Sequence, residues 1–395
     1  MTSLSVVIPA YNEADGIAEI SNRVLAVQPD LEKIGVGKLE LLVVDDGSKD
    51  DTAKIATAIN GVTLIKHPIN RGYGAALKTG FSKASGDLIG FLDADGTYPP
   101  EYFPELCVPA MDGVDLVVGS RMAGKDSQMP ITRRAGNLFF AGLLSFLGRR
   151  RISDSASGMR VFKRDVLKKL YPLPDGLNLT PVMSTRALHE GISMEEVPIP
   201  YSERLGRSKL NVFRDGSLFL RSIIWTALTY NPVRIFGFFG LICIAIALLI
   251  GLGLVITRIR GVTMLSGQGV VLLYGAMVAA VTGVSVFALG ITFNYLVSLF
   301  YKRPIRQGLF GRPILKNPLD NHFGWIGLIT MTVGFGIAFV SISLGINGWD
   351  IVRLWLYLLG SAMAILIGVQ LCTYWMIFRV LEEVIQREVQ FEVET

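Results

Sequence analysis

The spacing of apolar and charged positions divides the chain into two parts. Up to about Tyr230, short apolar runs alternate with charged, helix-like stretches, whereas the chain beyond Arg234 consists mainly of long apolar runs. Four of these runs contain no Asp, Glu, Lys or Arg, and they lie between Arg234 and Arg258, Arg260 and Lys302, Asp320 and Asp350, and Arg353 and Arg379. Because crossing a bilayer takes about 20 helical residues, we predict transmembrane helices near 235–257, 270–299, 324–346 and 354–378. One such run could be a buried helix of a soluble core, but four in succession favour a membrane domain.

The N-terminal part predicts a mostly parallel α/β sheet. Apolar, strand-like runs recur with helix-like stretches between them, and they read LSVVIPA, LELLVVD, VTLIKH, DLIGFLD and VDLVVGS. Near-continuous apolar strands that alternate with helices are typical of a parallel sheet covered on both faces. Ligands of such sheets bind at the carboxyl ends of the strands. Three polar clusters fall at that edge, so we expect the functional site there: Tyr11-Asn12-Glu13, Asp45-Asp46-Gly47-Ser48 and Asp93-Ala94-Asp95.

The segment between the two parts has an amphipathic, helical pattern. Its apolar stripe consists of Leu220, Ile223, Ile224, Ala227 and Leu228. The pattern fits an interfacial helix that lies on a bilayer, or a helix packed against the α/β domain, and the two are compatible. We therefore divide the chain into an α/β domain (1–210), an interfacial segment (211–232), a membrane domain (233–380) and a tail (381–395).

The distribution of charge predicts how the chain is oriented in the membrane. The formal net charge is +5, and five cations lie in the predicted loop between the second and third transmembrane helices: Lys302, Arg303, Arg306, Arg312 and Lys316. The loops on the opposite side carry Arg258, Arg260, Asp350 and Arg353. By the positive-inside rule, the α/β domain and both termini are then cytoplasmic, and the N-terminus shows no signal-peptide pattern. Since this charge reflects topology, we predict no nucleic-acid partner.

The cysteines and histidines offer no metal or disulfide framework. Cys107, Cys243 and Cys372 have no paired spacing, so neither a zinc site nor a disulfide is expected. The histidines, His67, His189 and His322, are scattered without ligand spacing, and we expect them to be structural.

Two carboxylates follow the apolar run 89–92 directly, at Asp93 and Asp95. Burying both without a partner would be costly, and a divalent cation resolves this. Hard oxygen ligands suit Mg²⁺ or Mn²⁺, and Mg²⁺ commonly takes one or two carboxylates together with substrate phosphates. The pattern Asp-x-Asp after a strand therefore predicts a metal–diphosphate site, although such pairs also occur in solvated turns and helix caps.

The glycine-rich stretch NRGYGAALKTG allows two interpretations. It matches neither GxGxxG nor a GK[ST] phosphate loop. We favour the simpler interpretation, in which Gly72 and Gly74 form a turn while Ala76, Gly80 and Ala84 give a helix a small face for close packing.

Several segments together carry a resemblance to a known family. They occur in the order VVIPAYNE, VVDDGSKDDT, GDLIGFLDADGTYPPE, GSRM, DSASGMR and EVPIPYSERLGRSKL, over roughly residues 4–210. They resemble the family 2 glycosyltransferases of the GT-A fold, specifically the dolichyl-phosphate mannose synthase type, which glycosylates polyprenyl phosphates. The apolar C-terminal part is similar to that of members with a four-helix membrane domain. The resemblance implies a Rossmann-like GT-A domain followed by four transmembrane helices.

The resemblance also implies how the donor is bound. Pro9, Tyr11 and Glu13 would surround the nucleotide base, Asp45 and Asp46 would contact base and ribose, and Asp93 and Asp95 would hold Mg²⁺ or Mn²⁺ on the diphosphate, with Asp93 also near the nucleotide. Members often have Gln two residues after the second Asp, where this chain has Thr97. This departure leaves the third protein ligand, and with it the metal preference, open.

The acceptor side is inferred from basic residues. A lipid phosphate requires cations close to the bilayer, and Arg is well suited to phosphate oxygens. The candidates that the resemblance supports are Arg121, Arg133 or Arg134, Arg204, Ser208 and Lys209. Surface charge or contact with lipid headgroups is the alternative for each Arg. Asp154 matches a family acidic position, and we expect it to orient a reacting group, with a helix cap as the alternative.

The function that these expectations define is an inverting transfer of a hexose from GDP-mannose or UDP-glucose to a polyprenyl or dolichyl phosphate. Because a phosphate oxygen is already anionic, no strong general base is required. A processive polysaccharide synthase is disfavoured, since the Gln-x-x-Arg-Trp motif of such enzymes is absent from the sequence. A non-catalytic lipid-sugar transporter should carry charges inside its spans, and these have none. Homo-oligomer formation is compatible with the sequence, which does not define an oligomeric state.

Overall fold

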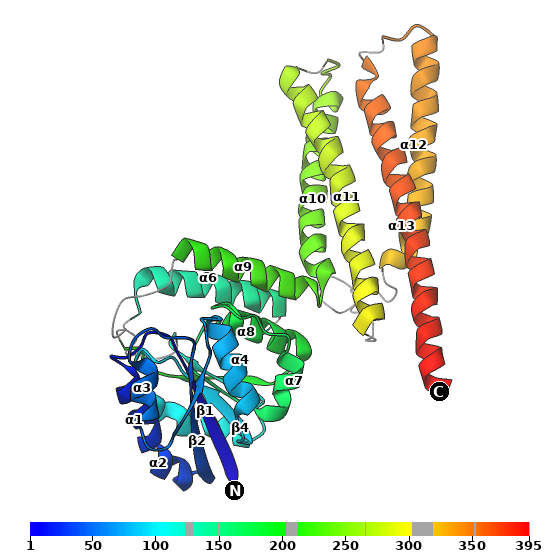
Figure 1. Cartoon of the computed structure of the whole chain (residues 1–395). Coiled ribbons are helices and arrows are strands. Elements are labelled where there is room, and N and C mark those ends of the chain that lie inside the picture. The colour runs from blue at the N-terminus through cyan, green and yellow to red at the C-terminus, as the bar shows by residue number, and fades with distance from the viewer. Residues whose placement is uncertain are drawn as a thin grey trace. The chain divides into compact units, whose positions relative to one another are not determined.

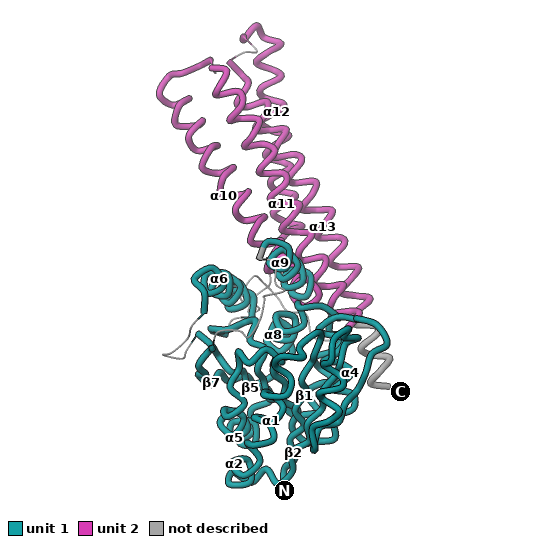
Figure 2. The backbone as a smooth tube through the Cα atoms, turned by 60° about the vertical axis from the view of Figure 1, so that its left-hand side comes forward, with its two compact units in different colours: residues 1–227 teal, residues 228–395 magenta. Residues whose placement is uncertain are grey.

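The structure is a computed structural model that describes residues 1–122, 129–148, 150–202, 212–264, 266–301, 319–350 and 353–394. The chain forms two compact units, Met1–Ala227 and Leu228–Thr395, which are coloured separately in Figure 2. The amphipathic segment after residue 211 therefore groups with the first unit. Each unit is described by itself below.

The first unit is built on a seven-stranded sheet with the order β3-β2-β1-β4-β6-β5-β7. The strands are β1 (Thr2–Ala10), β2 (Val36–Asp45), β3 (Val62–Lys66), β4 (Leu88–Phe91), β5 (Leu116–Ser120), β6 (Arg160–Lys163) and β7 (Met194–Pro198). The five strands expected from the apolar runs are present, and the mostly parallel sheet is confirmed. β6 and β7 were not predicted, and β6 runs antiparallel to both β4 and β5.

Helices cover both faces of this sheet (Figure 1). One face packs against α1 (Ile17–Ala26), α2 (Gln28–Lys33), α3 (Thr52–Thr57) and α5 (Phe103–Met111), the last preceded by the short helix η1 (Pro100–Tyr102). The other face packs against α4 (Tyr73–Lys83), α7 (Leu167–Leu170) and α8 (Leu179–Glu190), with η2 (Arg164–Val166) leading into α7. Alternating strand residues supply the two cores, as Val6 and Val7 do, because successive side chains point to opposite faces.

The register of β1, β2 and β4 brings their carboxyl ends to one edge. Ala10 at the end of β1 pairs with Asp45 at the end of β2, and Val7 pairs with Phe91 at the end of β4. The polar clusters that follow these strands consequently meet, as the parallel arrangement predicts. Gly80 makes this packing possible on α4, since a Cβ there would lie 2.2 Å from Cγ1 of Val7.

Two further helices, α6 (Ile131–Gly148) and α9 (Val212–Leu228), lie side by side over α8 in both views (Figures 1 and 2). The rings of Phe140 and Phe219 join them, with centroids 5.9 Å apart. Within the predicted apolar stripe of α9, Ile223 and Ala227 are buried and the others are half-buried. This stripe therefore packs against protein, as the second interpretation requires, and the compatible interfacial interpretation stays a prediction.

The second unit contains the four predicted apolar helices, and all four are long and apolar enough to cross a membrane. They are α10 (Pro232–Ile259), α11 (Gly267–Tyr301), α12 (Phe323–Ile346), which the short η3 (Leu319–His322) precedes, and α13 (Trp355–Glu394). The helix α13 continues through most of the segment that we assigned to a separate tail.

The four helices form two hairpins, α10–α11 and α12–α13, that close in the same way. Gly240 lies against Gly283 in the first hairpin and Gly327 against Gly368 in the second, and a Cβ on any of the four would lie 2.6–2.8 Å from the carbonyl oxygen opposite. Small residues at such contacts let membrane helices approach closely.

Candidate active site

A cavity of about 600 Å³ opens at the edge of the first unit where β1, β2 and β4 end. Its wall includes eight of the residues that the sequence predicted for the site: Pro9, Tyr11, Glu13, Asp46, Asp93, Asp95, Arg121 and Arg133. Asp45, Arg134 and Asp154 are not among the lining residues, whereas Arg204, Ser208 and Lys209 lie outside the described residues. These residues bring carboxylates from three loops and two arginines into one cavity, whose wall also includes Arg214 and Asp215.

Both carboxylates of the Asp-x-Asp pair are held by neighbouring hydroxyls. The Tyr73 hydroxyl donates a 2.7 Å hydrogen bond to Oδ1 of Asp93. The Thr97 hydroxyl donates a 2.6 Å bond to Oδ1 of Asp95, and its backbone N–H donates a second bond of 3.2 Å. Thr97, which stands where family members often have Gln, therefore orients Asp95.

The donor set fits a hard divalent cation. Among the residues that the structure describes, no group of three or more His, Cys, Asp or Glu side chains could hold a metal. Asp93 and Asp95 both line the cavity and carry carboxylate oxygens, and Mg²⁺ usually takes one or two carboxylates with waters and substrate phosphates. A cation at this site would thus depend on a bound diphosphate for its remaining ligands.

The carboxylates of Asp45 and Asp46 both accept hydrogen bonds from nearby loops. Asp45 accepts the backbone N–H of Ser48 at 3.0 Å and so stabilises the turn after β2. Asp46 accepts the N–H groups of Arg71 and Gly72 at 2.9 and 2.8 Å, and Nδ1 of His67 lies 2.7 Å from its Oδ1. Asp46 still borders the cavity, so its predicted contact with the nucleotide stays a prediction, while Asp45 belongs to the turn. His67 is buried, as its expected structural role requires.

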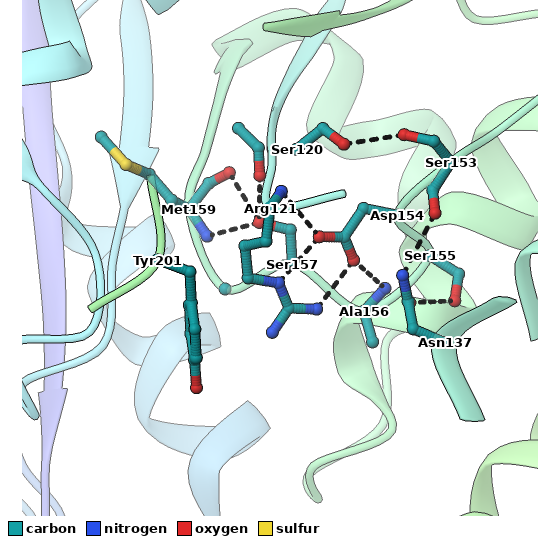
Figure 3. A network of polar contacts seen from close by, with 12 residues as sticks. Ser120, Arg121, Asn137, Ser153, Asp154, Ser155, Ala156, Ser157, Met159 and Tyr201 are labelled. Atoms are coloured by element: carbon teal, nitrogen blue, oxygen red, sulfur yellow. Dashed lines mark hydrogen bonds and ion pairs between the residues drawn. The ribbon is translucent and has the colours of Figure 1, made fainter. Parts of the chain in front are cut away.

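Arg121 and Asp154 form a buried ion pair (Figure 3). Nε and Nη2 of Arg121 each donate a 2.7 Å hydrogen bond to the carboxylate of Asp154, which is 0% exposed. The guanidinium also lies over the rings of Tyr98 and Tyr201, at 5.8 and 5.5 Å from their centroids. Burial alone would raise the pKa of Asp154, but the charge and hydrogen bonds of Arg121 hold it below its usual value.

This pair changes the roles expected of both residues. Asp154 orients Arg121 and does not line the cavity, and since no helix begins there, the helix-cap alternative is wrong. Glu196 on β7 holds the same loop by accepting the N–H groups of Ser153 and Asp154 at 2.9 and 3.0 Å. Arg121 itself lines the cavity, with Nε and Nη2 bound to Asp154.

The structure distinguishes between the two arginines at the start of α6. Arg133 lines the cavity, and its Nη1 lies 3.3 Å from the Tyr201 hydroxyl. Arg134 is exposed and does not line the cavity. The sequence left this choice open, because α6 itself was not predicted.

Sequence reasoning missed the aromatic and apolar part of the site. Tyr73 and Tyr98 lie on the wall of the cavity near the carboxylates, and its larger apolar side chains are Met129, Phe140, Leu177, Leu218 and Phe219. The helical spacing of apolar positions within 131–148 could have indicated α6, and with it Phe140. No comparable pattern marks Tyr73 or Tyr98.

One further cation lies beneath the site. Arg160 on β6 is 0% exposed, and it donates to the backbone carbonyls of Ser157 and Ser155, each at 3.1 Å. Its Nη1 has no hydrogen-bond partner in the described part of the chain. Burial lowers the pKa of Arg160 to about 10, so the side chain is still a cation at neutral pH.

Comparisons with known proteins identify the family of the N-terminal part. A family model described as glycosyl transferase family 2 matches residues 5–171, and one described as a domain of unknown function matches residues 232–392. The chain is 34% identical to the dolichyl-phosphate hexose transferase of Haloferax volcanii over 221 residues, which cover 56% of this chain and 92% of that protein.

Two other similarities extend the comparison. The chain is 28% identical over 321 residues to the undecaprenyl-phosphate 4-deoxy-4-formamido-L-arabinose transferase of Klebsiella pneumoniae, covering 80% of this chain and 94% of that protein. Among solved structures, glucosyl-3-phosphoglycerate synthase from Mycobacterium tuberculosis aligns with a TM-score of 0.46 and 23% identity, covering 57% of this chain and 80% of that one. The chain therefore belongs to the family 2 glycosyltransferases, among the relatives of enzymes that transfer sugars to polyprenyl phosphates.

Proposed function

We propose that the chain transfers a hexose from GDP-mannose or UDP-glucose to the phosphate of a polyprenyl or dolichyl phosphate, with inversion at the anomeric carbon. The observation that carries this proposal is a single cavity that combines paired carboxylates, three arginines (Arg121, Arg133 and Arg214) and an apolar wall. A nucleotide-diphosphate sugar with its cation suits the part of the cavity that Asp93 and Asp95 line, and a lipid phosphate suits the part that the arginines line. The named relatives, which act on dolichyl and undecaprenyl phosphates, support this acceptor class.

At the donor end, the loop that carries Pro9, Tyr11 and Glu13 would surround the base, and Asp46 would face the ribose. Asp93 and Asp95 would hold Mg²⁺ or Mn²⁺ against the diphosphate, in keeping with their oxygen-only donor set. When bound, such a cation supplies positive charge that stabilises the departing nucleoside diphosphate.

At the acceptor end, Arg121 and Arg133 would bind the lipid phosphate, since guanidinium groups match phosphate oxygens well. The ion pair with Asp154 fixes the orientation of the Arg121 guanidinium, and Tyr201 lies beside both arginines. The apolar wall around Phe140 and Phe219 would receive the first isoprene units. Arg204, Ser208 and Lys209 stay candidates for the same phosphate.

The chemistry requires alignment more than proton transfer. An oxygen of the acceptor phosphate forms the new bond to the anomeric carbon while the bond from that carbon to the nucleoside diphosphate breaks. The nucleophile is already anionic, so the site needs no strong base. Arg121 and Arg133 would orient the phosphate, and correct alignment of two reactants can lower a barrier by up to about 7–11 kcal/mol.

The α6–α9 face supports an acceptor that reaches the site from a bilayer. We define this face by its exposed apolar side chains, Ile131, Leu138, Phe139 and Phe146 on α6 and Phe213, Leu218 and Trp225 on α9. The α6 positions recur at helical spacing on one side of the helix, and a group of exposed apolar side chains favours contact with a partner or a membrane. We infer that this face lies on the cytoplasmic leaflet, with both termini on the same side.

A transfer assay tests the proposal. Purified protein is supplied with a short polyprenyl phosphate, Mn²⁺ or Mg²⁺ and a panel of radiolabelled sugar nucleotides, and label is counted in the lipid phase. We expect one donor to be accepted in a metal-dependent reaction and Asp95→Asn to abolish transfer. If the protein binds a nucleotide but no donor labels the lipid, the acceptor assignment is wrong.

A further inference from the structure

Asp93 is contacted by a side chain that belongs to another element of the sheet edge. Tyr73 is the first residue of α4, and its hydroxyl donates to Oδ1 of Asp93 at 2.7 Å, across 20 positions of the sequence. Both residues line the cavity. A hydrogen bond to one oxygen of a carboxylate limits the rotation of the group and so sets the direction in which the other oxygen faces.

The position of Tyr73 is itself fixed from the neighbouring strand. Gly72, which precedes α4, has a φ of +105°, a conformation that favours glycine. Its N–H and that of Arg71 donate to the two oxygens of Asp46, and the ring of His67 bridges Asp46 to the Thr79 hydroxyl, at 2.7 and 2.9 Å. The carboxylate of Asp46 therefore holds the start of α4, and with it Tyr73, in place.

A second backbone segment limits Asp93. A Cβ at Gly158 would lie 2.6 Å from Oδ2 and 3.0 Å from Oδ1 of Asp93, so the backbone of Gly158 lies directly against the carboxylate. The N–H of Gly158 donates a 2.7 Å bond to the Tyr98 hydroxyl, which fixes this backbone in turn. Asp93 thus has its orientation restricted by a hydroxyl and by a glycine backbone.

We propose that Tyr73 is a positioning residue, whose hydroxyl orients Asp93 for the binding of the divalent cation. The inference rests on the proposed function, because it takes Asp93 and Asp95 as the metal-binding pair. It assigns the same task to two residues, since Thr97 orients Asp95 in the way that Tyr73 orients Asp93. Residues that orient metal ligands typically change metal affinity about 10- to 100-fold when they are mutated.

The experiment measures the binding of Mn²⁺ without turnover. Electron paramagnetic resonance counts free Mn²⁺ while the full-length protein is titrated in detergent with UDP or GDP present, whichever the protein binds. Tyr73→Phe removes one hydroxyl and keeps the ring. Tyr102→Phe is the matched control, because Tyr102 does not line the cavity, and Asp95→Asn identifies the site. Melting temperature and nucleotide affinity in the absence of metal are measured for each variant.

We expect Tyr73→Phe to bind Mn²⁺ about 10- to 100-fold more weakly, with an unchanged melting temperature and unchanged metal-free nucleotide affinity, while Tyr102→Phe behaves as wild type. An unchanged Mn²⁺ affinity in Tyr73→Phe overturns the inference and leaves the metal site intact. An equal loss of metal-free nucleotide affinity also overturns it, since Tyr73 would then bind the nucleotide directly. If the wild-type protein binds no Mn²⁺, or Asp95→Asn binds it equally well, the metal site of the proposed function fails and this inference fails with it.

Discussion

Replacing Asp154 with Ala should destabilise the first unit by about 3–5 kcal/mol, the usual cost of removing one partner from a buried ion pair. This pair is a buried ion pair, since Asp154 is 0% exposed and the Arg121 side chain is 12% exposed. The variant leaves the Arg121 charge buried without its two 2.7 Å bonds. For a unit of this size, the loss corresponds to a fall of about 6–20 °C in melting temperature.

The assay is thermal unfolding of the full-length protein in detergent, with a surface pair as control. Arg23 and Glu101 also form a bidentate contact at 2.9 Å, but their side chains are 34% and 52% exposed. Glu101→Ala should therefore cost less than about 1 kcal/mol. The double variant Arg121→Met, Asp154→Leu should recover most of the stability, because apolar pairs of similar volume often replace buried ion pairs at little cost.

The pH dependence gives a second check on the same pair. The folded pKa of Asp154 is lowered, so its stabilising contribution is fully present above the unfolded value of about 3.9 and is lost as the pH falls through the folded value. The difference in stability between wild type and Asp154→Ala should therefore be constant from neutral pH down to about pH 5. A loss below about 1 kcal/mol in Asp154→Ala, no larger than that of an exposed pair, would refute the reasoning.

Three further predictions concern the site and its surroundings. In a steady-state assay, Arg133→Ala should lower kcat/KM for the lipid phosphate about 10- to 100-fold, which corresponds to the loss of a charge-assisted hydrogen bond. Arg134→Ala, which alters an exposed neighbour, should have a much smaller effect in the same assay. Gly158→Ala should lower transfer at least about tenfold, because its Cβ would lie 2.6 Å from Oδ2 of Asp93; unchanged rates would contradict the restriction of that carboxylate. Phe139→Glu with Phe146→Glu should slow transfer to a long-chain acceptor in liposomes but not to a short, water-soluble prenyl phosphate, and Ile69→Glu, also at an exposed position, should alter neither.

The sequence predicted the elements that have a strong, regular pattern. The continuous apolar runs of β1, β2 and β4 and the uncharged runs of α10 to α13 correspond to elements of the structure. Asp93 and Asp95 could be placed in one site with the polar clusters after β1 and β2 because parallel strands end at a common edge. The strands that were missed lack such a pattern: β6 begins with the buried Arg160, and β7 contains Glu195 and Glu196.

The roles of individual side chains depended on contacts that sequence spacing does not contain. Asp154 follows Arg121 by 33 positions, and their pairing arises because the loops after β5 and before β6 meet. Asp46 and Gly72 are joined through a backbone N–H, which every residue except proline carries and which therefore leaves no trace in the pattern. Tyr73 likewise reaches Asp93 through the position of α4 on the sheet.

The most direct test of the transferase assignment is the mass of the lipid product formed with the accepted donor. Mass spectrometry of the lipid phase should show the polyprenyl phosphate increased by one hexose residue, with a single phosphate retained and free nucleoside diphosphate in the aqueous phase. A lipid diphosphate carrying the sugar, which indicates transfer of a sugar phosphate, or a sugar found on a water-soluble acceptor with the lipid unchanged, would contradict the account.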